Sequence, residues 1–446
     1  MKDLTKGNPA KVMLQFAIPV ALGNLFQLAY SIADTRVVGS VLGESALAAV
    51  GATTSISTLF VGFLSGLTNG FSILIARELG AGREKGVRRF GAGTLVLALA
   101  TSLVLTVLCV AALPWILRIL NVQEELLTTA TSYIRVVILW LVMTCLYNAC
   151  AGILRAVGDT MAALVFLMCS CVLNVGLNLF FIIVCSMGVA GAALATVISQ
   201  AVAAFLSMGY MVKKYPMFRL GLEDLKVSAA DAKLLYGSGL SMATMMSLVF
   251  FGTLSLQSAI NTFGSEIIVA HTVARKLTEF FMMPFSFLGA TMTTYCSQNM
   301  GAGKIDRIRV GVKQALMMAC IWSVGMMILS YTVVPQLVYL VTGSDNAEIA
   351  RTAGLYLKVN TVFYFVPAAI AVLRNSLQGM GEHMVPVVSS FIEMAGKIAI
   401  AFALTPILQY WGIIVAEPII WILMVIPLIV RIRQLLWTGK RKAQTV

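Results

Sequence analysis

The stretch GAGREKGVRR at residues 80–89 follows a long apolar run, and GAGKIDRIR at residues 301–309 follows another such run 221 positions later. Two more pairs recur at nearly this spacing: LRAVGD at 154–159 with LQGMGE at 377–382, and Gly188 with Gly412. Three ordered matches at nearly one offset are improbable by chance. They indicate that the chain consists of two related halves.

The composition is typical of a membrane protein. Of 446 residues, 59% are apolar and 11% are charged, and the mean hydropathy is +0.91, whereas soluble domains contain about 45–50% apolar and about 25% charged residues. A soluble enzyme, a disulfide-rich secreted domain and a disordered tail are therefore excluded. The formal charge is +13, but the basic residues lie in short segments between apolar runs and form no continuous footprint for nucleic acid.

Twelve apolar stretches approach or exceed the roughly 20 residues that cross a bilayer. We expect membrane-spanning helices at 14–39, 46–76, 91–115, 126–153, 161–185, 188–212, 236–262, 266–297, 311–334, 350–376, 384–408 and 411–436. If the N-terminus is cytoplasmic, 23 of the 32 Lys and Arg fall in inner segments, as cytoplasmic loops require. Both termini are therefore predicted to be cytoplasmic, and the first stretch is a span and not a removed signal peptide.

The two halves predict the architecture. Each half contains six spans and starts and ends on the same side, so the halves are parallel repeats related by an axis along the membrane normal, as in many secondary transporters. The predicted fold class is an all-α polytopic membrane protein with twelve transmembrane helices in two pseudo-symmetric six-helix lobes. The predicted domains are an N-terminal lobe at 1–212, a cytoplasmic linker at 213–235 and a C-terminal lobe at 236–446, with a substrate cleft between the lobes.

The sequence lacks the motif of a nucleotide-driven transporter. No GxxxxGK[ST] sequence occurs, so a nucleotide site is not predicted and no cofactor is expected. Transport would then draw on an ion gradient. One proton crossing about 150 to 200 mV releases on the order of 4 kcal/mol, so a single titrating group within the membrane suffices.

Asp34 is the leading candidate for that group. On a helix, Asn24, Gln27, Ser31 and Asp34 share one narrow stripe, and Tyr30 lies one turn before Asp34. A polar stripe on an apolar span faces protein or water, and an ionisable group there is functional by default. Burial among neutral hydrogen-bonding groups disfavours a fixed charge on the carboxyl group, so Asp34 could take up and release protons.

Polar side chains on two other spans could accompany Asp34. Asn174 and Asn178 share a face of the fifth span at i, i+4, and Thr196 lies in the sixth span within the small-residue run GVAGAALATVIS. The alternative is that these groups only hold helices together, and their spacing favours neither interpretation. Pro19, about four turns from Asp34, would allow the first span to bend.

Several motifs lie along the chain: Tyr30, Asp34, Val38 and Gly39 in the first span, ALAAVG from Ala46, ELGAG after the second span, LRAVGD after the fourth, LNVGLN in the fifth and GAALATVISQ in the sixth. Together they resemble the motifs of the multidrug and toxic compound extrusion (MATE) family of bacterial efflux transporters. The resemblance spans the whole chain. It implies a V-shaped carrier in the bacterial cytoplasmic membrane that exports amphipathic, often cationic, compounds in exchange for protons or sodium ions.

The resemblance also implies roles for single residues. Asp34 matches the first-helix carboxylate that binds the coupling cation, Pro19 matches the proline at which that helix bends, and Asn174 and Thr196 match the polar companions of the carboxylate. Asn178 departs from the pattern, because many relatives have Asp there. Sodium, a hard cation, favours anionic oxygen ligands, so the loss of one carboxylate favours protons, with Na⁺ at Asp34 as the alternative.

The C-terminal half carries its own charged residues within predicted spans. Glu393 and Lys397 lie at i, i+4 with the acid first, which favours a neutralised structural pair. His271 is expected to be a hydrogen-bonded packing residue. The candidates for lining the cleft are Asn24, Gln27, His271, Arg275, Lys276, Glu279, Arg374, Asn375, Glu393 and Lys397.

Two other functions stay open at this stage. A flippase for lipid-linked saccharides would need cations along the cleft, for which Arg135, Arg275 and Arg374 are candidates. A membrane-embedded enzyme would need a constellation such as HExxH, and the two His of the chain have no suitable partner, so the protein is not expected to be an enzyme. We expect a monomer that meets small organic substrates and the bilayer, and no nucleic acid.

Overall fold

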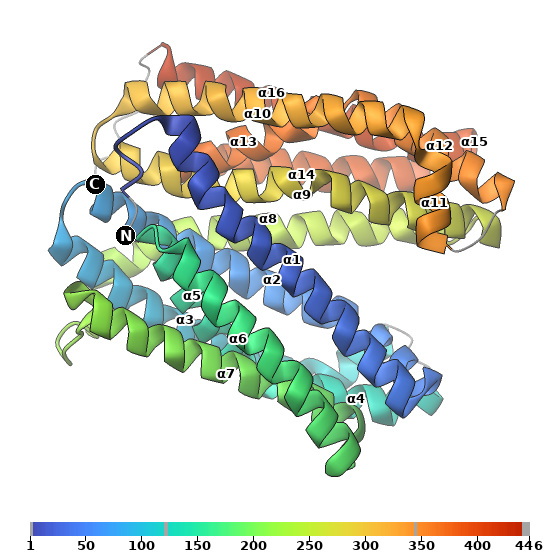
Figure 1. The fold of residues 1–446 in the computed structure, drawn as a ribbon, viewed down its shortest axis with the longest axis horizontal. Coiled ribbons are helices and arrows are strands. Elements are labelled where there is room, and N and C mark those ends of the chain that lie inside the picture. The colour runs from blue at the N-terminus through green and yellow to red at the C-terminus, as the bar shows by residue number, and fades with distance from the viewer. Residues whose placement is uncertain (1–2, 120–123, 343–345, 439–446) are drawn as a thin grey trace. The chain divides into compact units, whose positions relative to one another are not determined.

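The computed structural model describes residues 3–119, 124–342 and 346–438. All regular elements in this part of the chain are helical (Figure 1). The α-helices are α1 (Pro9–Leu42), α2 (Glu44–Gly80), α3 (Glu84–Ile119), α4 (Glu124–Leu139), α5 (Leu141–Ala156), α6 (Thr160–Leu179), α7 (Gly188–Lys214), α8 (Ala229–Ile260), α9 (Ser265–Gly301), α10 (Ile305–Thr332), α11 (Val334–Thr342), α12 (Ala347–Val362), α13 (Phe365–Gly379), α14 (Met384–Ala399), α15 (Thr405–Leu408) and α16 (Tyr410–Leu436). The 3₁₀-helix η2 covers Pro216–Phe218, and the π-helices η1 and η3 cover Phe180–Val184 and Ile400–Leu404.

These helices account for the predicted spans. Among the described residues, nine helical spans are long and apolar enough to cross a membrane, and two bent pairs, α4 with α5 and α12 with α13, add two more. Helix α9 has 37 residues, more than enough to cross, and it carries charged residues within its length. With α9 the described spans number twelve, and the predicted all-α fold is confirmed.

The ends and the continuity of several spans differ from the prediction. The predicted spans 126–153 and 350–376 are not single straight helices, because α4 and α5 meet at 47° and α12 and α13 at 54°. Hydropathy detects a run of apolar residues but carries no information on the direction of the backbone within it. The short helix α11 follows the ninth span as an element of its own.

The chain divides into two compact units. The first contains Ile18–Ala243, which includes most of α1, all of α2 to α7 and the first part of α8. The second contains Leu4–Ala17 and the described part of Thr244–Val446. The change of unit therefore falls inside helix α8, and the domain limits at 212 and 236 stay predictions.

The two units repeat local features in the same order. A bent helix pair in each unit, described above, is followed by a helix that ends in a π-helix: α6 continues into η1 and α14 into η3. After each π-helix comes a non-glycine residue with positive φ, Ser186 at 52° and Gln409 at 50°. Such backbone positions are uncommon, so their recurrence supports the repeat that the sequence predicts.

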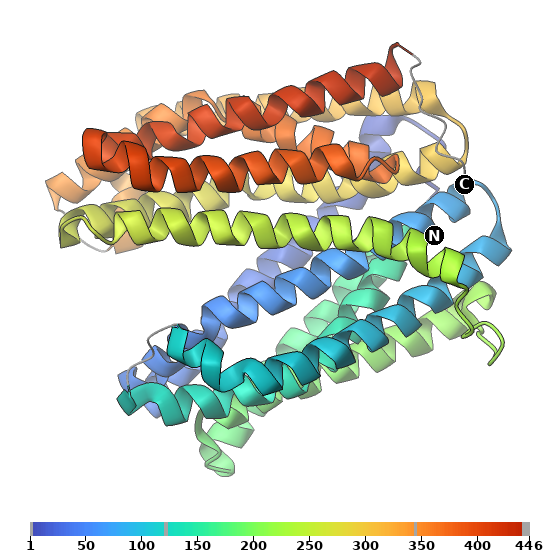
Figure 2. The same ribbon diagram turned by 180° about the vertical axis from the view of Figure 1, so that it is seen from behind.

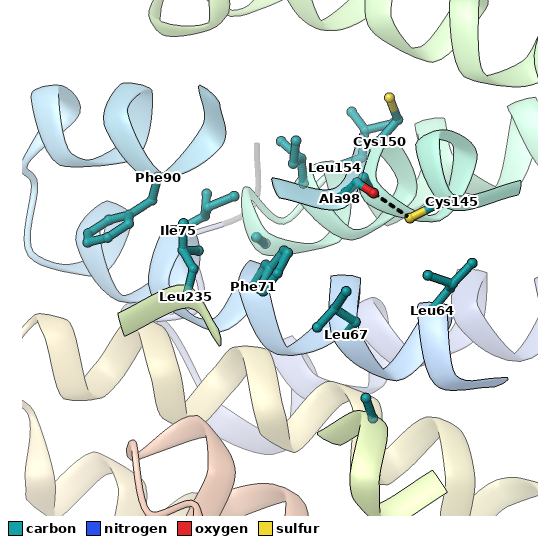
Figure 3. Packing of buried hydrophobic residues seen from close by; sticks show 14 of the residues in the cluster. Leu64, Leu67, Phe71, Ile75, Phe90, Ala98, Cys145, Cys150, Leu154 and Leu235 are labelled. Atoms are coloured by element: carbon teal, nitrogen blue, oxygen red, sulfur yellow. Dashed lines mark hydrogen bonds between the residues drawn. The ribbon is translucent and has the colours of Figure 1, made fainter. Parts of the chain in front are cut away.

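The core of the first unit lies between α2, α3, α5 and the first turns of α8. Figure 3 shows its labelled side chains: Leu64, Leu67, Phe71, Ile75, Phe90, Ala98, Cys145, Cys150, Leu154 and Leu235. The Cys145 thiol donates a hydrogen bond to the Ala98 carbonyl at 3.4 Å. Cys145 and Cys150 are fully buried, so both pack as small apolar side chains.

Helices α2 and α8 approach each other very closely within the first unit. Gly66 on α2 faces Ala243 on α8, and Gly70 faces Gly239. The two residues on each helix are four positions apart. A Cβ added at Gly70 would lie 2.5 Å from the Gly239 Cα atom. This contact has the small-xxx-small pattern by which membrane helices bring their backbones together.

The predicted linker packs on α3 within the same unit (Figure 2 shows the molecule from behind). Arg88 forms an ion pair with Asp224 at 2.5 Å, and Arg89 forms one with Asp231 at 3.5 Å. The hydrogen bonds from Arg88 and from the Gly221 N–H hold the pKa of Asp224 below its usual range. The segment between α7 and α8 is therefore held by specific polar contacts.

Candidate functional site

Five predicted residues of the first unit form one hydrogen-bonded network. The Asn178 amide on α6 donates to a carboxylate oxygen of Asp34 on α1 and, at 2.9 Å, to Asn174 Oδ1. Asn174 donates to Thr196 Oγ1 on α7 at 3.1 Å, and the Tyr30 hydroxyl lies 3.1 Å from the same oxygen. In Figure 1, α1 is dark blue, and α6 and α7 are green. Tertiary structure thus brings together residues up to 166 positions apart.

The network is buried and offers unused oxygen lone pairs. Asn178 and Asn174 are 0% and 1% exposed, and Asp34 is half-buried. In the part of the chain that the structure describes, Asn178 Oδ1 is a buried oxygen without a hydrogen-bond partner. An unsatisfied buried acceptor is unfavourable, and this one belongs to the amide that contacts Asp34. The arrangement suits a proton or a cation, which would be attracted to the carboxylate and to a free amide oxygen.

Local structure fixes the two amides. Asn174 and Asn178 are one turn apart on α6, so they lie on the same face of that helix. Asp159 caps the start of α6 by accepting a hydrogen bond from the Ala162 N–H at 3.3 Å. At the other end, α6 becomes the π-helix η1 two residues after Asn178, and π-helical turns frequently occur at functional sites.

The remaining candidates on α1 do not join this network. Asn24 is half-buried, and Gln27 and Ser31 are exposed. Helix α1 continues through Pro19 as one element, and the change from the second unit to the first lies next to that proline, between Ala17 and Ile18. The bend at Pro19 stays a prediction.

A shallow hollow lies on the same unit near the end of α1. Its lining residues are Ser31, Ile32, Thr35, Arg36, Gly39, Ser40 and Leu47. Arg36 is exposed and lines this hollow. The polar network described above is not part of this lining.

In the second unit, Glu393 and Lys397 form the predicted ion pair. The Lys397 ammonium lies 2.8 Å from a Glu393 carboxylate oxygen, and both residues are buried. Lys397 also donates to Thr253 Oγ1 on α8 at 3.3 Å. Arg374 is 3.9 Å from the other Glu393 oxygen and donates to Ser390 at 3.2 Å.

This unit contains a second ion pair, which the sequence pattern did not predict. Arg275 on α9 binds Glu417 on α16 at 2.7 Å, and Glu417 is 4% exposed. Glu417 is the only acid in the predicted twelfth span, and that signal could have revealed it. His271 is buried with Nδ1 3.3 Å from the Tyr410 hydroxyl, which confirms the predicted hydrogen-bonded packing, whereas Glu279 is exposed on α9.

Another buried acid lies outside the spans of the first unit. Asp159 accepts hydrogen bonds from Tyr215 at 2.5 Å and from Lys214 and Tyr210 at 2.9 Å each. Burial alone would raise the pKa of Asp159, but these hydrogen bonds and that from the Ala162 N–H outweigh it and lower the pKa to about 2. Asp159 is therefore a structural group, charged at neutral pH, that connects the end of α7 to the start of α6.

Comparison with known proteins identifies the family. The family model MatE matches residues 19–180 and again residues 241–403. The chain belongs to the MatE family. Its two matched segments begin 222 residues apart, which agrees with the internal repeat. MATE proteins are membrane transporters. Four residues of the network, Tyr30, Asp34, Asn174 and Asn178, lie within the first matched segment, and Thr196 follows it.

The relatives of this MATE protein include two from Bacillus subtilis (strain 168). The probable multidrug resistance protein YpnP is 27% identical over 69% of this chain and 68% of its own length. The probable multidrug resistance protein YoeA is 26% identical over 88% of this chain and 86% of its own length. A solved structure of a multidrug resistance MATE family transporter of the MOP superfamily, in an outward-facing conformation, has a TM-score of 0.89, 23% identity and 98% coverage of both chains.

Proposed function

We propose that this protein is a multidrug efflux transporter. It exports amphipathic or cationic organic compounds across the bacterial cytoplasmic membrane by alternating access, and it exchanges them for protons. Membership of the MatE family, the multidrug resistance names of its relatives and the intramembrane acid in the first unit support this function.

One observation carries the proposal. The Asp34 carboxylate is held by the Asn178 amide, whose own oxygen is buried and unpaired among the described residues. A carboxyl group in this position can be charged only if a proton donor, a cation or a hydrogen bond compensates the loss of water. Protonation of Asp34 would therefore change the hydrogen bonds between α1, α6 and α7, and this change would couple ion uptake to drug release.

The chemistry of the network favours protons over sodium. Asp34 is the only carboxylate in the network, and its companions Asn174, Asn178, Thr196 and Tyr30 are neutral. Sodium, as a hard cation, gains most from several anionic oxygen ligands. Na⁺ at this site would have a single carboxylate, that of Asp34, and its other ligands would be amide and hydroxyl oxygens.

The basic residues and the contacts of the described ends support an orientation for the chain in the membrane. Arg307 near the start of α10 binds the carbonyl oxygens of Lys6 and Gly7 at 2.7 Å each, and Arg309 binds that of Leu436 at 2.5 Å. Both described ends of the chain thus meet the start of α10, which lies in a segment rich in Lys and Arg. We place this side in the cytoplasm.

The lipid-linked saccharide flippase receives less support. It depended on cations along a cleft, but two of the three candidates are engaged by carboxylates, Arg275 by Glu417 and Arg374 by Glu393. Arg135 is exposed on α4. We therefore retain drug efflux as the function.

The Asp34→Asn variant tests the proposal. Asn fills nearly the same space but cannot bind and release a proton, so drug-stimulated proton movement in proteoliposomes should be abolished while the protein still inserts. Asp306→Asn is the matched control, because it removes the same formal charge from a side chain that is 91% exposed, and it should retain coupled transport. Undiminished coupled export by Asp34→Asn would disprove the role of Asp34.

A further inference from the structure

The two units contain the same arrangement of polar side chains on different helices. In the first unit, Asn178 on α6 donates to Asn174 one turn earlier and to Asp34 on α1. In the second unit, Lys397 on α14 donates to Glu393 one turn earlier and to Thr253 on α8. Each pair lies shortly before a π-helix, η1 or η3.

The two arrangements differ in the charge beside the acid. The first unit has one acid, Asp34, surrounded by neutral amides and hydroxyls. The second unit has one acid, Glu393, and an ammonium group, Lys397, that is 2.8 Å away and belongs to the protein itself. Lys397 is 6% exposed and Glu393 is 9% exposed. The ammonium group has therefore lost most of its hydration and is paired with a carboxylate, as a bound cation would be.

We propose that the Lys397 ammonium is a resident cation, which permanently fills in the second unit the counterpart of the proposed coupling site in the first. The inference rests on the proposed function, because it takes Asp34 as the exchangeable site. A cation tethered to α14 cannot leave, so the second unit contributes stability and no exchangeable ion. The transporter then carries one exchangeable coupling site in each chain, at Asp34.

The other charged groups around the pair support this assignment. Arg374 lies 3.9 Å from Glu393, so the carboxylate faces two cations and the group of three has a net positive charge. Arg275, the next cation of this unit, is paired with Glu417. A mobile cation would be repelled from this group while Lys397 is charged. Arg374 is farther from Glu393 than Lys397 and donates to Ser390, so it does not occupy the same space.

Chemical rescue tests the resident cation. Lys397→Ala leaves the Glu393 carboxylate without its nearest partner, and loss of one member of a buried ion pair is strongly destabilising. The purified full-length variant should melt several degrees below the wild type. Methylammonium chloride should restore most of this loss, whereas choline chloride at the same concentration, whose cation is too large for the space left by the side chain, should not.

Two further variants make the result decisive. Lys397→Ala/Glu393→Gln has no carboxylate to attract the ion, so its melting temperature should not respond to methylammonium, and neither should that of the wild type. If Lys397→Ala does not fold, Lys397→Gln, which fills most of the volume, replaces it, and its melting temperature should rise at low pH, where Glu393 can be protonated. The resident cation would be overturned if methylammonium raised the melting temperatures of Lys397→Ala and Lys397→Ala/Glu393→Gln equally. It would also be overturned if Lys397→Ala did not respond to methylammonium and Lys397→Gln did not respond to low pH.

Drug-stimulated proton movement measures the number of exchangeable sites. Asp34→Asn should leave no drug-stimulated proton movement, whereas residual movement that Glu393→Gln removes would show that the second unit exchanges an ion and would overturn the inference. Rescue by methylammonium does not involve Asp34. A failed rescue would therefore leave the proposed function intact, and intact coupling in Asp34→Asn would refute the proposed function whatever the rescue shows.

Discussion

At the scale of single residues, the choice of amide or acid at position 178 is proposed to decide which ion the site accepts. Asn178 supplies a donor to Asp34 and a buried, unpaired oxygen. An acid at the same position would supply no donor but a second negative charge. Two carboxylates in one buried site repel each other unless a proton or a cation lies between them.

We predict that Asn178→Asp increases the response to sodium. A second carboxylate would give Na⁺ two anionic oxygen ligands, so ethidium efflux from proteoliposomes should respond to an imposed Na⁺ gradient, which should have little effect on the wild type. The exchanged variant Asp34→Asn/Asn178→Asp keeps one carboxylate and serves as the control. A sodium response equal to that of Asn178→Asp in this control would show that the number of carboxylates is not what matters.

At the scale of elements, helix ends and helix crossings depend on a few groups. Asp159 connects the start of α6 with the end of α7 through Tyr210 and Lys214, and with the following residue Tyr215. Gly70 and Gly239 allow α2 and α8 to touch. Both contacts lie in the first unit, and the Asp159 contact joins two of the helices that carry the Asp34 network, α6 and α7.

The low pKa of Asp159 predicts a contribution to stability that disappears in acid. The pKa is about 2 in the folded state and 3.8 as the ordinary value. The unfolded state therefore binds the proton more tightly, so the contribution is complete above pH 3.8 and is lost as the pH falls through about 2. Melting temperatures of the wild type should approach those of Asp159→Asn over this interval and exceed them at higher pH; a constant difference would contradict the assignment.

Gly70→Ala tests the close contact of α2 with α8. The new Cβ would lie 2.6 Å from the Ser238 carbonyl oxygen as well as 2.5 Å from Gly239 Cα, so the helices must separate, at a cost of about 1–3 kcal/mol. Gly62→Ala on the same helix is the control, because nothing lies within 4 Å of its Cβ position, and alanine there is expected to be neutral or stabilising. Equal melting temperatures of the two variants would refute the packing argument.

At the scale of the whole molecule, we expect only one of the two units to couple transport to an ion gradient. The chain has two related units, but the acids described within their membrane spans differ: Asp34 lies among neutral groups in the first, whereas Glu393 and Glu417 are paired with bases in the second. We therefore expect transport to draw on one ion gradient through one unit. In this proposal both units have the repeated fold, but only the first unit contains a coupling site.

Wild-type transport should show this preference directly. Ethidium efflux from proteoliposomes is expected with an imposed pH gradient in the absence of sodium, because Asp34 is the single exchangeable acid of the network. The reverse condition, an Na⁺ gradient at equal pH on both sides, should drive little efflux. Efflux driven by sodium alone would replace protons with sodium as the coupling ion and would leave Asp34 as its binding residue.

The site could be predicted in part from the sequence. The stripe on the first span and the i, i+4 spacing of Asn174 and Asn178 are local patterns, and they pointed to residues that the structure brings together. Asn24 and Gln27 belong to the same stripe but stay outside the network. A stripe specifies the face of a helix, whereas contact depends on how far along its length the neighbouring helices cross it.

Hydropathy, basic residues and the repeated turns determined the spans, the two halves and the family resemblance, because each of these is a property of short stretches of chain. Tertiary structure alone decided that Asn178 meets Asp34, that Arg275 meets Glu417 and that Lys397 reaches Thr253. These partners come from different helices, and helix packing selects them. In a membrane a buried charge needs such a partner. The role of each charged side chain in this protein therefore depends on how the helices pack.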